Sequence, residues 1–190
     1  MLALLPTFRR ALDLGCGTGR LTQVLAQYGD CIGMDTSLAM LAQAQSKTHL
    51  GLTQGDAYSM PYANASFDVV VALRLFFHFA NLEPLLRQIA RAVTDQGTII
   101  FDTYLWSPRA WTPLDRDRWG ESVFIHSPSQ VENLAKELDL RVERQEFCFL
   151  FSPYIYRRLP LKVIQVLARV ETWVPTRLRA RVFWKLVRTN

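Results

Sequence analysis

The stretch ALDLGCGTGRLT, residues 11–22, decides the fold of this chain. It places three glycines, Gly15, Gly17 and Gly19, within five residues, directly after an alternating apolar run. Glycine adopts positive φ readily and leaves no Cβ between the backbone and a ligand. A strand that ends in such a turn and is followed at once by a helix is typical of a nucleotide-type binding loop. The stretch therefore predicts an α/β domain with a ligand site at the end of its first strand.

The rest of the chain alternates apolar strands with amphipathic helices. The run FDVVVAL, residues 67–73, has near-continuous β-branched content, which favours burial on both faces of a parallel sheet. We predict strands over 10–14, 31–35, 50–53, 67–73, 98–104 and 141–151, and helices over 19–28, 37–45, 82–93 and 127–138. The alternation predicts a doubly wound, Rossmann-like sheet, mostly parallel with an antiparallel edge strand. Residues 105–126 are expected to form a long loop.

The composition suits one packed globular domain. The chain has 190 residues, of which 49% are hydrophobic and 21% charged. Three cysteines without metal-type spacing indicate reduced thiols and a cytoplasmic protein, and no metal site is expected. No apolar run is long enough to cross a membrane. We assign residues 1–156 to the main domain and residues 157–190 to a basic, helical extension of it.

The extension carries the positive charge of the chain. Residues 157–190 hold nine Lys and Arg against one acid, whereas residues 1–156 have a net charge of −3. Two amphipathic helices are predicted, one on each side of Pro175. Their apolar stripes are Val163, Val166, Leu167, Val170 and Trp173 before it, and Leu178, Val182 and Leu186 after it.

Two readings of the extension stay open. Basic amphipathic helices bind anionic membranes peripherally, with Trp173 and Trp184 at the headgroup level. Alternatively, the apolar stripes pack on the domain and the charges face water. Nucleic acid is a less suitable partner, because the rest of the chain is acidic and has no base-stacking motif.

Three acids lie at or just after the ends of the first three predicted strands. Asp13 lies two residues before Gly15, where a carboxylate would repel a pyrophosphate but suits a cationic ligand such as an α-ammonium group. Asp35 ends the second strand, where a carboxylate can accept both hydroxyls of a ribose. Asp56 follows the third strand and can accept from an adenine amino group.

These segments resemble the class I S-adenosylmethionine-dependent methyltransferases that act on small molecules. The matching pieces are LDLGCGTGR at 12–20, GMD at 33–35, the run at 55–79 and TIIFDTY at 98–104. The resemblance implies S-adenosylmethionine as cofactor and a small-molecule acceptor. We expect an apolar acceptor, a quinone, lipid or other metabolite, and a membrane-bound extension would suit the first two. The resemblance also implies that the cofactor is held by Asp13, Gly15, Cys16, Gly17 and Gly19 at the methionine moiety, Asp35 and Thr36 at the ribose, Asp56 and Ala57 at the adenine, and Arg74 beneath the sulfonium.

Three aromatic residues are candidates for the acceptor side. His78 follows the fourth predicted strand, where it could act as a general base or pack between two phenylalanines. Tyr104 and Trp106 follow the fifth strand, at the edge where open α/β sheets bind ligands, although core packing suits them equally. His126 is expected to be a surface or capping residue.

The beginning of the sequence leaves other functions open. Members of the resembling family carry one or two helices before the first strand, and only ten residues precede Ala11 here. We therefore expect a longer native start, an open site, or a second copy or partner chain that covers the cofactor. A non-catalytic cofactor-binding or partner subunit is one alternative, and a nicotinamide oxidoreductase, which Asp13 disfavours, is another.

Overall fold

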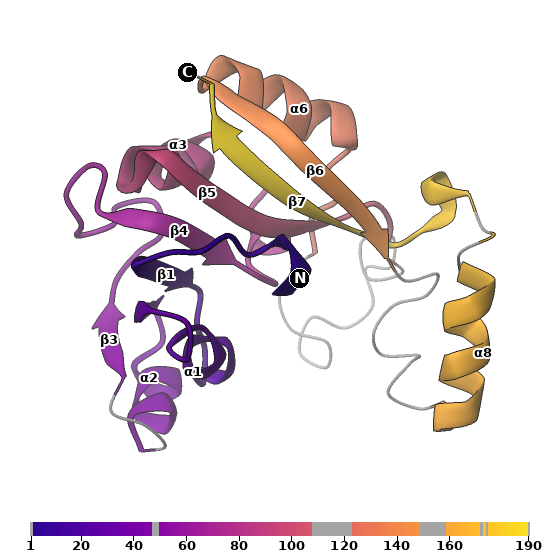
Figure 1. Cartoon of the computed structure of the whole chain (residues 1–190), viewed down its shortest axis with the longest axis horizontal. Coiled ribbons are helices and arrows are strands. Elements are labelled where there is room, and N and C mark those ends of the chain that lie inside the picture. Colours follow the sequence, from indigo (N-terminus) through magenta and orange to yellow (C-terminus); the bar gives the residue numbers. More distant parts are fainter. Residues whose placement is uncertain are drawn as a thin grey trace.

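A seven-stranded sheet forms the centre of the structure, a computed structural model that describes residues 2–46, 50–107, 123–148, 159–171, 173 and 175–189. The strand order is β3-β2-β1-β4-β5-β7-β6 (Figure 1). The strands are β1 Arg10–Leu14, β2 Asp30–Asp35, β3 Gly51–Gln54, β4 Phe67–Ala72, β5 Val93–Tyr104, β6 Leu140–Cys148 and β7 Arg181–Arg188. Neighbours among β1 to β5 pair in parallel, and β7 is antiparallel to β5 and β6. The predicted Rossmann-like, mostly parallel sheet with an antiparallel strand at its edge region is confirmed.

Helices connect the strands on both faces of the sheet. They are α1 Arg20–Leu25, α2 Leu38–Gln45, α3 Glu83–Ala92, α6 Pro128–Glu137 and α8 Leu161–Glu171, with short 3₁₀ turns η1 Leu2–Leu4, η2 Phe76–His78 and η3 Thr176–Leu178. The hydroxyl of Ser37 accepts from the Met40 N–H at 3.3 Å, and the hydroxyl of Ser127 accepts from the Gln130 N–H at 3.3 Å. These bonds begin α2 and α6 where the sequence predicts, because each satisfies a backbone N–H that the first helical turn leaves free.

The buried valines of β4 separate two apolar layers. Val69, Val70 and Val71 are fully buried, as predicted for a central parallel strand. Val70 belongs to the layer that α3 and α6 cover, which includes Leu85, Leu86, Ile89, Val131 and Ala135. Val69 and Val71 belong to the other layer, which Leu4, Phe8 and Leu25 cover. The sheet is thus covered on both faces, and its ligand-binding edge lies where the parallel strands end.

The C-terminal half of the extension is a strand, so the prediction of a second amphipathic helix after Pro175 was wrong. Residues 181–188 form β7, inserted between β5 and β6, with Tyr104 paired to Arg181. Val182, Trp184 and Leu186 are fully buried on one face of this strand. A stripe at every fourth residue fits a helix, but it also fits a strand, because four is a multiple of the strand period of two. Trp184 therefore lies in the core and cannot reach a membrane surface.

Several element boundaries differ from the predicted ones. α1 ends at Leu25, and β5 begins at Val93, five residues earlier than predicted. Most of the predicted loop 105–126 and the predicted boundary between 156 and 157 lie outside the described residues. Within the described part of the chain, no helix has the length and apolar content to cross a membrane.

Candidate cofactor and acceptor site

A cavity of about 400 Å³ opens at the carboxyl ends of the first four strands. Its wall comprises Leu14, Gly15, Met34, Asp35, Thr36, Gly55, Asp56, Ala57, Arg74, Leu75, His78 and Phe79. Seven of the predicted site residues are among them, namely Gly15, Asp35, Thr36, Asp56, Ala57, Arg74 and His78. The strands end at one edge because they run parallel, so residues far apart in the sequence meet there.

The three loop glycines all have positive φ, as the opening stretch predicts. The values are 73° at Gly15, 52° at Gly17 and 73° at Gly19. A Cβ built on Gly15 would lie 2.9 Å from Leu75 Cδ1, and one on Gly19 would lie 3.0 Å from Ala44 Cβ. Glycine at these two positions therefore allows close packing with neighbouring elements.

Asp35 joins the glycine loop to the end of β2. Its Oδ2 accepts a hydrogen bond from the Gly17 N–H at 2.8 Å, and its Oδ1 accepts from the Ser37 N–H at 2.9 Å. The half-buried carboxylate is fixed by these bonds, and each oxygen keeps a lone pair for a ligand in the cavity. Such an arrangement suits a pair of vicinal hydroxyls.

Asp56 also lines the cavity and lies in an exposed turn after β3. One of its oxygens accepts from the Tyr58 N–H at 2.9 Å, and Ala57 beside it is buried. The turn therefore presents a carboxylate and the backbone of a small residue to the cavity. Met34 and Phe79 add apolar surface to the cavity wall.

Asp13 lies beneath the glycine loop and not in the cavity wall. It is 2% exposed, and its Oδ2 accepts from the Thr22 hydroxyl at 2.6 Å. Burial raises the pKa of Asp13 from 3.8 to about 6, because the charged form loses its hydration. This hydrogen bond links β1 to α1, the two elements that the glycine loop connects.

Cys16, Gly17 and Gly19 are also outside the residues that line the cavity. The Cys16 thiol packs against Gly33, where a Cβ would lie 2.9 Å from Sγ. Burial raises the pKa of this thiol to about 12, so it is a packing group and not a nucleophile at neutral pH. Of these three residues, Gly17 touches the site indirectly, through its bond to Asp35.

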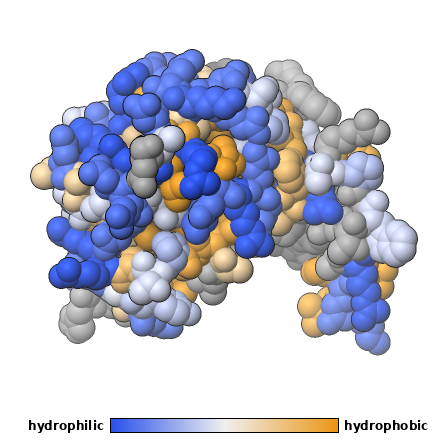
Figure 2. Space-filling model, turned by 45° about the horizontal axis from the view of Figure 1, so that its top comes forward, coloured by the Kyte–Doolittle hydropathy of each residue, from blue (hydrophilic) through white to orange (hydrophobic). Residues whose placement is uncertain are grey.

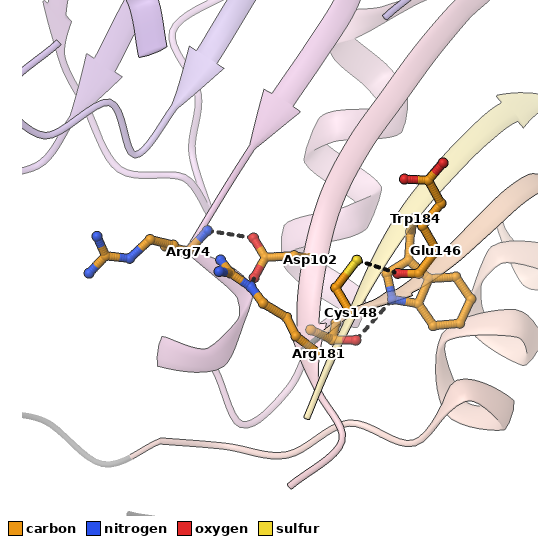
Figure 3. A network of polar contacts seen from close by, with 7 residues as sticks. Arg74, Asp102, Glu146, Cys148, Arg181 and Trp184 are labelled. Atoms are coloured by element: carbon orange, nitrogen blue, oxygen red, sulfur yellow. Dashed lines mark hydrogen bonds and ion pairs between the residues drawn. The ribbon is translucent and has the colours of Figure 1, made fainter. Parts of the chain in front are cut away.

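Arg74 is held at the cavity wall by a buried ion pair that the sequence analysis did not identify. Its φ of 60° is unusual for a residue with a side chain, and its N–H donates to Asp102 Oδ1 at 2.7 Å. Asp102 Oδ2 accepts from Arg181 Nε, and both residues of this pair are buried (Figure 3). The last strand thus fixes the conformation of a residue at the cavity. Asp102 and Arg181 are 79 residues apart, and no local sequence pattern links them.

The three aromatic candidates lie near one another. His78 belongs to η2, is exposed, and its ring centroid lies 4.3 Å from that of Phe77. Phe77 also makes an edge contact with Tyr104, at 5.1 Å between centroids. Trp106 donates from Nε1 to the Leu178 carbonyl at 3.2 Å. Only His78 lines the cavity, whereas Tyr104 and Trp106 lie at the end of β5 beside it.

His126 is buried, so the expectation of a surface or capping role was wrong. It is 5% exposed, and its Nε2 lies 2.9 Å from the Phe79 carbonyl oxygen. Burial lowers the pKa of His126, so the ring is neutral at pH 7 and donates to this carbonyl from Nε2. The bond fixes Phe79, which lines the cavity.

The sequence is similar to those of known proteins. Residues 12–101 match the family model described as a methyltransferase domain. A malonyl-[acyl-carrier protein] O-methyltransferase of Legionella pneumophila is 34% identical over 120 residues, which is 57% of this chain and 42% of that protein. A demethylmenaquinone methyltransferase of Lactobacillus johnsonii is 31% identical over 140 residues, which is 68% of this chain and 56% of that protein.

The fold also matches solved structures. An S-adenosylmethionine dependent methyltransferase from Mesorhizobium loti superposes with a TM-score of 0.72 at 20% identity, over 98% of this chain and 95% of that one. At this identity the likeness concerns the fold. The chain spans about half the length of the two curated relatives described above.

Proposed function

We propose that this chain is a class I S-adenosylmethionine-dependent methyltransferase that transfers the methyl group of that cofactor to a small, apolar acceptor. The observation that carries the proposal is the cavity at the carboxyl ends of the strands, which the fixed carboxylate of Asp35 lines together with Asp56. The relatives support an organic acceptor, since one is named for demethylmenaquinone and another for a malonyl group.

The residues of the cavity fit the chemistry of S-adenosylmethionine. Asp35 has lone pairs for the two ribose hydroxyls, and Asp56 has one for an amino group of the adenine. Apolar side chains of the cavity wall, including Met34 and Phe79, suit the faces of a purine ring. The bound cofactor supplies an electrophilic methyl group on a sulfonium.

The protein's own contribution is positioning. A methyl transfer is fast when the nucleophile is held in line with the methyl group and water is excluded. Arg74, fixed through Asp102, and His78 both line the cavity. We assign to His78 the role of accepting a proton from a hydroxyl acceptor, which a general base supports by raising the acceptor's nucleophilicity.

An apolar acceptor is supported by the apolar side chains of the cavity wall, which include Leu14, Met34, Leu75 and Phe79. Phe77 contacts the rings of both His78 and Tyr104, so further aromatic side chains adjoin this wall. Aromatic rings favour flat or extended apolar molecules, because such rings bury a large area and stack against other rings. Quinols and acyl groups are acceptors of this class.

Calorimetric titration with S-adenosylhomocysteine tests the cofactor part of the proposal. We expect one site per chain, and no binding at millimolar concentration by a folded sample would refute it.

Transfer of a labelled methyl group to a panel of quinols, phenols and fatty acids tests the reaction. Binding without transfer to any acceptor would favour a non-catalytic cofactor-binding subunit. Thermal protection by NAD, with none by S-adenosylhomocysteine, would favour an oxidoreductase.

A further inference from the structure

Helix α8 stands away from the sheet as an arm and leaves apolar side chains uncovered. In Figure 1 it lies at one side of the molecule, separated from the strands and the other helices. Six of the eleven exposed large hydrophobic residues in the described part of the chain belong to residues 161–178: Leu161, Val163, Val166, Val170, Trp173 and Leu178. In Figure 2 apolar and hydrophilic residues lie side by side on the projecting arm. The arm therefore presents an amphipathic surface with no cover.

Three exposed valines of α8 form one stripe, and Leu161 lies on the other side of the helix. Val163, Val166 and Val170 follow helical spacing and are 41%, 58% and 46% exposed. Ile164 and Leu167 of the same helix are half-buried, so they too are partly open to solvent. Trp173, just after the helix, is 89% exposed. An exposed apolar patch of this kind marks an interaction site.

Positive charge accompanies the stripe. Lys162 and Arg169 are exposed and lie two helical turns apart, on the face next to it. The three cationic side chains of β7 form ion pairs within the sheet domain. Arg181 pairs with Asp102, Lys185 with Glu143 and Arg188 with Asp95. Lys162 and Arg169 thus place positive charge beside exposed apolar side chains. This combination of apolar and cationic groups complements an anionic lipid surface.

The arm leaves the sheet at the same edge as the cavity. Cys148, the last residue of β6, and Tyr104, the last of β5, both pair with Arg181, the first of β7. The chain between β6 and β7 therefore departs from and returns to the carboxyl ends of the parallel strands. Trp106, two residues after the end of β5, donates to the Leu178 carbonyl, so the segment after α8 contacts this edge of the sheet.

We propose that α8 docks this protein on anionic membranes, with Val163, Val166, Val170 and Trp173 at the headgroup level and the cavity edge turned toward the lipid. An acceptor dissolved in the bilayer then reaches the cavity without crossing water. The choice of a lipid-borne acceptor rests on the proposed methyl transfer, whereas the docking does not.

Co-sedimentation of the full chain with vesicles tests the docking. We expect binding to equimolar phosphatidylglycerol and phosphatidylcholine at low salt, and weak binding to phosphatidylcholine alone. Salt at 0.5 M should reduce the binding, because it screens the attraction within a few ångströms. A protein that stays in the supernatant with anionic vesicles at low salt overturns the proposal.

Neighbouring positions on α8 supply a matched pair of variants. Val166→Glu and Gln165→Glu add the same charge to exposed positions of one helix, but only the first lies on the apolar stripe. We expect Val166→Glu to weaken vesicle binding roughly tenfold or more. Gln165→Glu and Lys162→Gln should each weaken it about fivefold or less, the effect of one charge near the surface. Equal losses in Val166→Glu and Gln165→Glu would overturn insertion of the stripe.

Two further measurements separate the alternatives. The fluorescence of the full chain should shift to the blue with anionic vesicles, and Trp173→Phe should remove that shift. A dimer of the parent chain that Val166→Glu dissociates would instead assign the stripe to a second copy and overturn the membrane docking. Vesicle binding by a folded protein that does not bind S-adenosylhomocysteine would refute the proposed function and leave the docking intact.

Discussion

The carboxylate of Asp35 accepts a hydrogen bond from the backbone N–H of Gly17 at 2.8 Å, across 18 residues of sequence. The same side chain accepts from the Ser37 N–H, so it holds the end of β2, the start of α2 and the glycine loop together. A ligand in the cavity meets this carboxylate already fixed in place. Fixed acceptors bind a ligand tightly because little side-chain freedom is lost on binding.

Replacing Asp35 should therefore weaken cofactor binding. We expect Asp35→Ala to reduce the affinity for S-adenosylhomocysteine by about 2 kcal/mol or more, through the loss of two charge-assisted hydrogen bonds to the ribose. Isothermal titration calorimetry measures it. Asp30→Ala is the control, since Asp30 begins the same strand, is exposed, and makes only a surface ion pair with Arg10. An Asp35→Ala variant that binds like the parent would show that Asp35 is not the ribose ligand.

The proposed role of His78 predicts a loss of rate with little loss of cofactor affinity. His78→Ala should lower kcat about 100-fold or more with a hydroxyl acceptor, because the proton acceptor is gone. Initial rates with the acceptor that gives turnover in the panel measure this loss, and calorimetric titration with S-adenosylhomocysteine measures the cofactor affinity. A variant with the parent's rate would assign His78 to packing against Phe77.

The buried pair of Asp102 and Arg181 should matter for stability as well as for the site. Arg181→Met leaves the Asp102 carboxylate buried without its partner, which costs about 3–5 kcal/mol of unfolding free energy. The double variant Asp102→Asn/Arg181→Met removes the stranded charge and should recover part of this loss. Urea denaturation measures all three proteins.

Lys185→Met is the matched control for Arg181→Met in β7. Lys185 pairs with Glu143, whose side chain is 41% exposed, so the loss should stay below about 1 kcal/mol. Similar losses from Arg181→Met and Lys185→Met would contradict the importance of the buried pair.

Asp102→Leu should in addition weaken S-adenosylhomocysteine binding, because the Arg74 N–H loses its acceptor.

The buried carboxyl of Asp13 should make the free energy of unfolding increase as the pH falls, the opposite of the usual effect of a carboxylate. Its pKa is about 6 in the folded protein, above its ordinary 3.8, so the folded state holds this proton more tightly than the unfolded state does. The contribution of Asp13 to the unfolding free energy should therefore increase as the pH falls from 7 through 6 toward 4. The difference in pKa corresponds to roughly 3 kcal/mol at neutral pH.

Asp13→Asn isolates this contribution. The amide oxygen can still accept from the Thr22 hydroxyl, and it carries no charge. The variant should be more stable than the parent at pH 7, and the advantage should shrink as the pH falls to 5. Denaturation curves at several pH values measure the difference. An advantage that is constant with pH would show that Asp13 does not titrate in this range.

Local sequence patterns determined the parallel core and most of the cavity. The glycine loop follows from residues that adopt positive φ, and β4 follows from a β-branched run. Asp35, Asp56 and Arg74 could be placed because each follows a strand, and parallel strands end at one edge. These features depend on neighbours within a few residues, so the sequence alone is enough to predict them.

The tertiary structure decided what depends on distant partners. The stripe of Val182 and Leu186 fits both a helix and a strand, and the open position between β5 and β6 selects the strand. Asp102 and Arg181 meet only through that strand. The buried ring of His126 finds a hydrogen-bond acceptor in the carbonyl of Phe79, which is distant in sequence. In the first half of the extension, by contrast, the helix forms as predicted and its stripe stays uncovered. Burial is a property of the assembled sheet, so no local pattern could separate the half that packs from the half that projects.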